Sequence, residues 1–173
     1  LRERLDRSLV ERRLVAVELS TAEVREYYEG FANGVVWPLF HYLLERVPRQ
    51  APQWSSYQEV NRRFADVTAR HYRPGDTIWV HDYQLMLVPA LLRARLPAAP
   101  IGFFLHVPFP AAELYRTLPW REPLLRGVLG ADLVGFHTAA YARHFTETAR
   151  SLLDAGGTGG ELHWEDRSIR VSD

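Results

Sequence analysis

The stretch from Thr77 to Pro110 constrains the fold most, because two short apolar runs in it flank an amphipathic segment. The runs, at 77–82 and 101–106, are rich in β-branched and aromatic residues, as is typical of strands buried on both faces. Between them, residues 83–96 place leucine and valine at helical spacing. The pattern predicts a strand, a crossover helix and a second, parallel strand.

Ionisable residues end both predicted strands. His81 and Asp82 end the first strand, and His106 ends the second. In an open parallel sheet the ligand crevice lies beyond the carboxyl ends of the strands, so we expect Asp82 and His106 to face one crevice. Each also has a purely structural interpretation, Asp82 as the N-cap of the following helix and His106 as a hydrogen-bonded core histidine. Taken together, the two residues favour the functional interpretation, because a single helix cap does not explain why two adjacent strands both end in an ionisable residue.

Composition removes several classes of protein. With 173 residues, 47% of them hydrophobic, the chain can bury the core of one globular domain. Its 21 basic and 21 acidic residues balance, which argues against a nucleic-acid partner attracted by bulk charge. There is no cysteine, so disulfides, thiolate catalysis and cysteine–metal sites are excluded. The sequence contains no glycine-rich phosphate loop, metal-binding motif or serine nucleophile elbow, and no cofactor or metal is expected.

No apolar run approaches the length of a membrane span, and no signal peptide is visible. We therefore expect no membrane partner and a cytoplasmic protein. The chain begins at Leu1 rather than methionine and enters a charged segment at once, so we expect it to be part of a longer protein. Homo-oligomerisation is left open.

Capping signals divide the first part of the chain. Residues 1–13 fit a short amphipathic helix or a loop equally well, and residues 14–19 are predicted as a strand. Ser20 and Glu23 have the spacing of a capping box. A helical region is therefore expected over 21–46.

This helical region should contain an interruption between Asn33 and Pro38. The Asn33-Gly34 pair is typical of turns, and Pro38 disfavours helical geometry at Trp37. Farther along, the apolar spacing predicts strands and helices in alternation, which indicates a layered α/β fold. Helices are expected at 56–72, 111–115, 122–129 and 139–153, a third strand at 131–136, and a hairpin of 162–164 with 168–171.

Four motifs resemble those of the trehalose-phosphate synthases and occur in that family's order. The chain reads YYEGFANGVVWPLFHY at 27–42, IWVHDYQL at 78–85, GFFLHVPFP at 102–110 and DLVGFHT at 132–138. The resemblance extends over nearly the whole chain. It implies an α/β fold with a Rossmann-like parallel sheet and flanking helices, the amino-terminal half of a two-domain glycosyltransferase of the GT-B type.

The resemblance also implies an activity. Enzymes of this family transfer glucose from UDP-glucose to glucose 6-phosphate with retention at the anomeric carbon, in a cleft between two Rossmann-like domains and without a metal. Residues 1–173 would be an incomplete amino-terminal, acceptor-side domain, and the donor-binding carboxyl-terminal domain would be absent. The partners implied are glucose 6-phosphate and a nucleotide-sugar donor.

Carried over motif by motif, the resemblance implies roles for five residues. Tyr28 would contact glucose 6-phosphate, and Trp37 would line the acceptor pocket and help to select the anomer. Asp82 would hydrogen-bond the acceptor sugar. His106 would lie beside the donor glucose, and Val107 would shape the pocket next to it. Asp82 and His106 are the catalytic candidates.

Two features depart from the family. Gln84 stands where the family usually has histidine, outside the residues with implied roles. The family's amino-terminal arginine and its glycine-containing donor loop would lie upstream of Leu1, and its cations for the UDP phosphates would lie beyond Asp173. Such cations stabilise a departing diphosphate, so the isolated chain is expected to be inactive. Two alternatives stay open, a non-catalytic regulatory homologue and a related sugar-nucleotide transferase with another acceptor.

Overall fold

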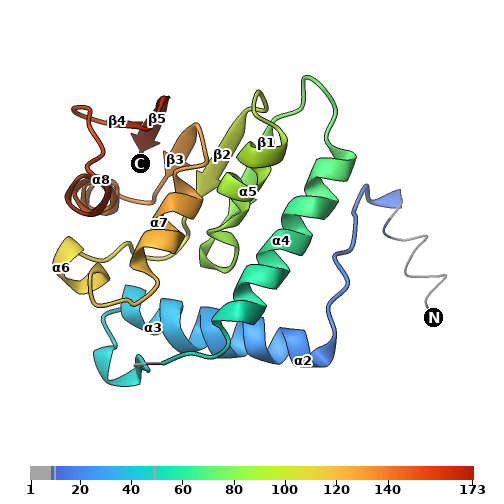
Figure 1. The fold of residues 1–173 in the computed structure, drawn as a ribbon, viewed down its shortest axis with the longest axis horizontal. Coiled ribbons are helices and arrows are strands. Elements are labelled where there is room, and N and C mark those ends of the chain that lie inside the picture. The colour runs from blue at the N-terminus through green and yellow to red at the C-terminus, as the bar shows by residue number, and fades with distance from the viewer. Residues whose placement is uncertain (1–8, 10, 49) are drawn as a thin grey trace.

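The computed structural model describes residues 9, 11–48 and 50–173, and its strands form one sheet with the order β1-β2-β3-β5-β4 (Figure 1). The strands β1 (Ile78–His81), β2 (Ile101–Phe104), β3 (Leu133–Gly135) and β5 (Arg167–Ser172) run parallel, and β4 (Glu161–Trp164) pairs antiparallel with β5. The predicted parallel pair and the predicted hairpin are both confirmed. The helix-or-loop interpretation of residues 1–13 lies mostly outside the described residues.

Helices connect these strands. The amino-terminal region contains α2 (Thr21–Glu23), η1 (Val24–Val36), α3 (Trp37–Phe40), η2 (Leu44–Arg46) and α4 (Trp54–His71). The connections within the sheet contain η3 (Tyr83–Leu85), α5 (Val88–Arg95), α6 (Ala112–Tyr115), α7 (Arg121–Val128) and α8 (Ala139–Leu153). Predicted bounds agree within two residues for α4, α6, α7 and α8, whereas the helix predicted over 83–96 is divided into η3 and α5. Within the described part of the chain, no helix combines the length and apolarity needed to cross a bilayer.

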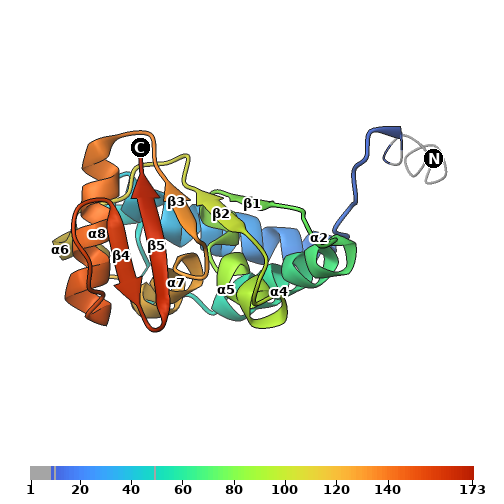
Figure 2. The same cartoon turned by 90° about the horizontal axis from the view of Figure 1, so that it is seen from above.

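One face of the sheet carries the core. Val80, Phe103 and Val134 are 5% exposed or less, α5 packs on β2, and α4 and α7 flank α5 on the same side of the sheet (Figure 2). The other face is open at β1, where Trp79 is 45% exposed and lies against Gly102, since a Cβ there would be 2.1 Å from the Trp79 ring. The prediction that the first strand is buried on both faces is therefore wrong. The crossovers step through β1, β2, β3 and β5 in one direction, and right-handed connections then place their helices on one face.

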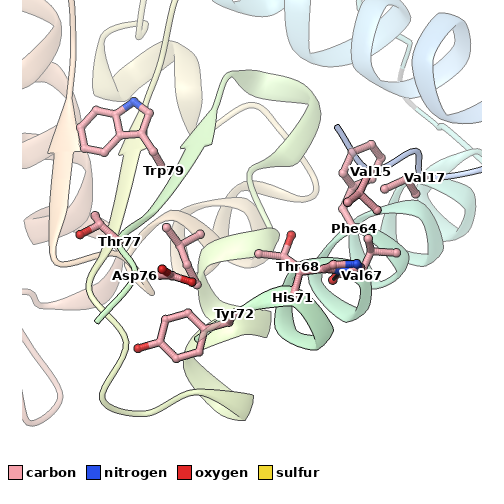
Figure 3. A pocket seen from close by; sticks show the side chains of 11 residues that line it. Val15, Val17, Phe64, Val67, Thr68, His71, Tyr72, Asp76, Thr77 and Trp79 are labelled. Atoms are coloured by element: carbon pink, nitrogen blue, oxygen red, sulfur yellow. Dashed lines mark hydrogen bonds between the residues drawn. The ribbon is translucent and has the colours of Figure 1, made fainter. Parts of the chain in front are cut away.

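Residues 14–19, predicted as a strand, have no regular secondary structure and belong to no sheet. Leu14 and Val15 are each 53% exposed. Their apolar pattern suits a strand, yet no described strand pairs with them, and an extended segment needs such a partner to become part of a sheet. Val15 and Val17 instead line an open cavity of about 490 Å³ beside the β1 edge, near Trp79 (Figure 3).

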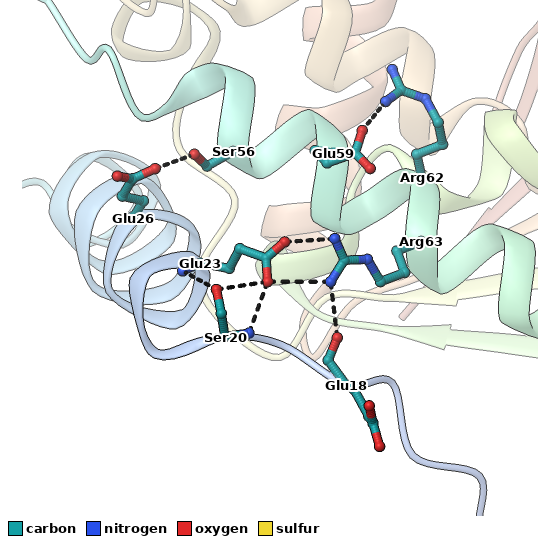
Figure 4. A network of polar contacts seen from close by, with 8 residues as sticks. All are labelled: Glu18, Ser20, Glu23, Glu26, Ser56, Glu59, Arg62 and Arg63. Atoms are coloured by element: carbon teal, nitrogen blue, oxygen red, sulfur yellow. Dashed lines mark hydrogen bonds and ion pairs between the residues drawn. The ribbon is translucent and has the colours of Figure 1, made fainter.

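The first helical region begins where predicted and passes through the predicted interruption, but its continuous part ends at Phe40, before the predicted end at residue 46. The Glu23 backbone N–H donates to Ser20 Oγ at 3.2 Å, and the Ser20 N–H donates to Glu23 Oε2 at 2.8 Å, so the capping box is confirmed (Figure 4). The interruption predicted between Asn33 and Pro38 is wrong, because η1 and α3 continue through both residues. Pro38 has no N–H to donate, but hydrogen bonds on either side carry the helix past it: the Trp37 N–H donates to the Ala32 carbonyl and the His41 N–H to the Trp37 carbonyl. The helix ends just before Tyr42, whose φ is 64°.

Candidate functional site

Polar and aromatic side chains meet at the carboxyl edge of β1, β2 and β3. His81 ends β1 and Asp82 follows it, while His106 and His137 lie two residues beyond the ends of β2 and β3. Asp82 Oδ1 accepts a hydrogen bond from the His106 backbone N–H at 3.2 Å. The two predicted catalytic candidates therefore lie side by side on neighbouring strand ends.

Asp82 has an unusual backbone. Its φ of 73° and ψ of 171° fall in a region that is essentially restricted to glycine. Its N–H donates to the Phe104 carbonyl at 2.8 Å, and its Oδ1 also accepts from the Tyr83 N–H at 3.0 Å. The N-cap interpretation is therefore confirmed, with η3 as the capped helix. Among the described residues no donor reaches Oδ2, so the carboxylate caps with one oxygen and leaves the other open to a ligand.

Three histidine rings form a row along this edge. His81 Nδ1 lies 2.8 Å from His106 Nε2, and the two rings are nearly parallel and edge to edge, with centroids 5.1 Å apart. The His137 ring meets His106 edge-on at 5.5 Å. His106 is exposed, so its interpretation as a core histidine is wrong. Across the described residues, no group of three or more His, Asp or Glu side chains could hold a metal ion.

The π-helical form of η1 decides which side chains share a face. Tyr28 and Trp37 are nine residues apart, which is about two and a half turns of an α-helix and would set them on opposite faces. The i→i+5 bonding of a π-helix widens each turn to roughly 4.4 residues, so nine residues make about two turns and bring both side chains to one face. Burial follows this wider period, since Tyr27, Phe31 and Val36 all point into the core. Tyr28 lies outside this buried set and is 43% exposed.

Asn33 lies between Tyr28 and Trp37 on this helix face and connects it to the strand edge. The Tyr83 hydroxyl donates to Asn33 Oδ1 at 2.7 Å. Burial raises the pKa of Tyr83 to about 12, with smaller contributions from Tyr28 and Asp82. Both residues thus lie within electrostatic reach of the same phenol. The helix face and the strand edge therefore meet at Tyr83.

Trp37 and Val107 are positioned by other contacts. Trp37 is half-buried and stacks on His41, with ring centroids 4.0 Å apart and an interplanar angle of 27°. Val107 is half-buried directly after His106 and packs against the hydrophobic core. The strand edge thus supplies Asp82, His106 and Val107, whereas Trp37 comes from the helix and is oriented by its stacking on His41.

A buried polar cluster behind the site holds the backbone that follows Asp82. Asn61 on α4 is fully buried. Its Nδ2 donates to the Gln84 carbonyl at 3.0 Å, and its Oδ1 accepts from the Leu87 backbone N–H at 3.1 Å. The hydroxyl of Tyr57, also fully buried, donates to the Tyr83 carbonyl at 2.7 Å. Burial raises the pKa of Tyr57 well above its ordinary value, so the phenol stays protonated as a donor. The loop after Asp82 is therefore fixed by side chains of α4.

Sequence patterns do not single out Asn33, Asn61 or Tyr83 as parts of this arrangement. A signal exists for Asn61, because it stands four residues after Tyr57 on the apolar face of α4, where a polar side chain must find partners. Asn33 gives no such signal, because Asn followed by Gly predicts a turn rather than a helix interior.

The sequence matches the profile of glycosyltransferase family 20 over residues 2–173. The chain belongs to glycosyltransferase family 20. It is 47% identical over 167 residues to the trehalose-6-phosphate synthase of Mycolicibacterium gilvum, with 91% of this chain and 33% of that protein covered.

Two solved structures are similar to this family 20 chain. An α,α-trehalose-phosphate synthase (UDP-forming) from Burkholderia xenovorans, in complex with glucose 6-phosphate, is 33% identical with a TM-score of 0.82, covering 90% of this chain and 35% of that one. The amino-terminal domain of a Candida albicans trehalose-6-phosphate phosphatase is 34% identical with a TM-score of 0.85, covering 96% of this chain and 38% of that one.

The chain spans about a third of the length of the synthases that it matches. Its sheet and flanking helices have the fold of the amino-terminal portion of two-domain, GT-B type glycosyltransferases. The fold class implied by the four motifs is thus confirmed, and so is the membership of the family.

Proposed function

We propose that this chain is part of a retaining glucosyltransferase that makes trehalose 6-phosphate from UDP-glucose and glucose 6-phosphate. The observation that carries the proposal is the strained Asp82 at the carboxyl edge of the sheet, which caps η3 with one oxygen and keeps the other open. Ligands of open parallel sheets bind at this edge, and backbone strain gathers at functional sites. A carboxylate oxygen without a partner suits a sugar hydroxyl. Membership of family 20 supports the choice of reaction.

In this proposal glucose 6-phosphate lies between the helix face and the strand edge. Asp82 Oδ2 accepts a hydrogen bond from an acceptor hydroxyl and assists the movement of its proton as that oxygen attacks. The Trp37 ring lies against an apolar face of the sugar and favours one anomer. Tyr28 contacts the acceptor from the same helix face as Trp37.

The donor glucose lies next to the acceptor at the same edge. His106 lies beside it, and Val107 shapes the pocket there. The departing UDP needs cations to stabilise its diphosphate, and we assign these to a donor-binding domain outside residues 1–173. This division makes residues 1–173 an incomplete, acceptor-side domain. We also assign a cytoplasmic location, because sugar phosphates and nucleotide sugars are cytoplasmic metabolites; homo-oligomerisation stays a prediction.

Activity of the full-length protein tests the proposal. With UDP-glucose, we expect UDP release and trehalose 6-phosphate when glucose 6-phosphate is the acceptor, and little release with glucose or fructose 6-phosphate. The isolated chain 1–173 is the control and should show no turnover, because one wall of a cleft cannot orient both substrates. Turnover by the isolated chain comparable to that of the full-length protein would contradict the division into two domains.

One alternative function is favoured by a specific observation. The chain is as similar to the amino-terminal domain of the Candida phosphatase as it is to the Burkholderia synthase. A non-catalytic homologue would keep the fold and lack donor turnover. A full-length protein that binds glucose 6-phosphate but releases no UDP with any acceptor would support this alternative, and release with a different acceptor would indicate another transferase.

A further inference from the structure

Among the described residues, the His106 ring has one hydrogen-bond partner, and that partner is another histidine. His81 Nδ1 lies 2.8 Å from His106 Nε2, with the rings edge to edge and nearly parallel at an interplanar angle of 24°. The strand register sets this distance, because β1 and β2 pair His81 with Phe104, two residues before His106. The contact is thus built into the parallel pair that carries the candidate site.

A separation of 2.8 Å between two ring nitrogens requires one proton between them. With both rings neutral, two arrangements satisfy this requirement. Either His81 Nδ1–H donates to a bare His106 Nε2, or His106 Nε2–H donates to a bare His81 Nδ1. In both, His106 Nε2 is occupied, so Nδ1 is the ring nitrogen that remains for a ligand.

The second arrangement is favoured, because it leaves both imidazoles in the Nε2–H tautomer, the lower-energy form of a neutral histidine side chain. No described carboxylate or carbonyl bonds to either ring and reverses that preference. The neighbouring carboxylate of Asp82 accepts the backbone N–H of His106 and makes no described hydrogen bond to its ring.

The surrounding aromatic rings restrict the orientation of each imidazole plane but do not determine which ring nitrogen carries the proton. Phe104 lies 4.8 Å from His106 between ring centroids, and His137 meets His106 edge-on at 5.5 Å. Trp79 lies edge-on to His81 at 6.1 Å. These contacts restrict ring rotation. Among the described residues, His81 is the hydrogen-bond partner that can hold the His106 ring in its preferred tautomer.

We propose that His81 is a positioning residue for His106. It accepts from His106 Nε2–H and so fixes the tautomer and the orientation of that ring. The bare Nδ1 of His106 then accepts a hydrogen bond from a hydroxyl of the donor sugar. The identity of this ligand rests on the proposed function, whereas the tautomer does not. Partners that bond the second nitrogen of a functional imidazole select its tautomer in this way.

Nitrogen NMR of the full-length protein, labelled with ¹⁵N at histidine, tests the tautomer at a pH of about 8.5, above the ordinary range for imidazole. We expect His106 Nε2 at the protonated, pyrrole-type position and Nδ1 at the bare, pyridine-type position; His106→Gln identifies these signals by their loss. In His81→Leu both signals should move part of the way toward averaged positions, because the intrinsic preference for Nε2–H remains but no partner holds it. In His81→Asn, whose side-chain oxygen can replace the bare Nδ1, they should return. A bare Nε2 in the wild type, or unchanged shifts in His81→Leu, would overturn the proposal.

Kinetics separate positioning from packing. His81→Leu should lower kcat/KM for UDP-glucose by roughly two- to tenfold, the effect of one hydrogen bond, and His81→Asn should recover to within about twofold of the wild type. His163→Leu is the matched control. His163 lies on β4, the last strand in the sheet order, and its Nδ1 is also 2.8 Å from a partner, Ser168 Oγ. This variant should leave kcat/KM unchanged. Equal losses in the Leu and Asn variants would mean that His81 only packs, and would overturn the proposal.

The two proposals fail in distinguishable ways. If the full-length protein makes no trehalose 6-phosphate, the proposed function fails. The nitrogen shifts need no substrate, so they still decide whether His81 sets the tautomer of His106.

Discussion

The two edges of the sheet each hold an aspartate and use it in opposite ways. At the amino edge, Asp132 Oδ2 accepts from Arg93 Nη2 at 2.6 Å and from the Ile101 N–H at 2.8 Å. Its Oδ1 accepts from Arg167 Nη2 at 2.9 Å. At the carboxyl edge, Asp82 takes two backbone N–H groups on Oδ1, and no described cation pairs with it.

This difference separates a structural carboxylate from one that is free to bind. Partial burial alone would raise the pKa of Asp132, but the hydrogen bonds from the Ile101 backbone and from Arg93 outweigh it and hold that pKa below its ordinary value. Both oxygens of Asp132 are used and two arginines pair with it, so this carboxylate has no oxygen left for a ligand. Asp82 keeps one oxygen open and sits in a backbone conformation that costs about 1–3 kcal/mol.

The largest expected effect comes from Asp82→Asn in the full-length protein. Asn caps a helix about as well as Asp, so the free energy of unfolding should stay nearly unchanged. The charged acceptor is lost, and hydrogen bonds to charged groups contribute about 1.5–3 kcal/mol, so kcat/KM should fall roughly ten- to a hundredfold. The measurement varies glucose 6-phosphate at saturating UDP-glucose. Full activity in the Asn variant, together with lost stability in Asp82→Ala, would make Asp82 a cap and nothing more.

Asp132→Asn should give the opposite pattern. Removing this charge leaves Arg93 and Arg167 without their shared partner, and we expect the free energy of unfolding to fall by about 1–2 kcal/mol. The Asp132 side chain is 46% exposed, so solvent screening keeps the loss at this modest size. Urea unfolding measures the loss, and kcat/KM per folded molecule should match the wild type. A loss of kcat/KM as large as that of Asp82→Asn would erase the distinction between the two edges.

Asp82→Gly should uncouple stability from activity. Glycine adopts the φ and ψ of this position without strain and is a fair N-cap. We therefore expect the free energy of unfolding to rise by about 1 kcal/mol while transfer is lost with the carboxylate. Asp82→Ala, which keeps the strain and loses the cap, is the control and should be less stable than the wild type. A Gly variant that is also less stable would mean that the carboxylate, and not the backbone, decides stability here.

Features with a local cause could be predicted from the sequence. Ser20 with Glu23 marks the start of the first helix, and Thr138 caps α8 by accepting from the Tyr141 N–H. The two apolar runs that end in Asp82 and His106 predicted the parallel pair of strands, and with it the position of both residues at one edge of the sheet. Caps, turns and hydrophobic periodicity depend on residues that are close together in the chain, so they can be recognised from the sequence alone.

Features that depend on distant contacts could not be predicted in this way. Helix propensity places a break at Asn33, but the Tyr83 hydroxyl bonds its side chain and the wide π-helical turns continue past it. Those turns, and not the α-helical period, bring Tyr28 and Trp37 to one face. Asn61 shows the same limit, because its partners, the backbone groups after Asp82, are known only once α4 packs beside η3.

The smallest expected effect concerns a third carboxylate, Glu23, which resembles Asp132 in using both oxygens. Arg63 Nη2 lies 2.5 Å from Glu23 Oε1, and the Ser20 backbone and hydroxyl donate to Oε2 (Figure 4). The hydrogen bond from Arg63, followed by those from Ser20, lowers the pKa of Glu23 from an ordinary 4.5 to about 2.

A pKa that is lower in the folded than in the unfolded state means that ionised Glu23 stabilises the fold above pH 4.5, and that this contribution is lost as the pH falls from 4.5 toward 2. Urea unfolding of the wild type should therefore lose free energy more steeply over this window than that of Glu23→Gln, and the two curves should converge near its acid end. The pair lies at the surface, so the difference should be small and should shrink with added salt. Parallel curves would mean that Glu23 is no better stabilised in the folded chain than in the unfolded one, unlike the carboxylate of Asp132.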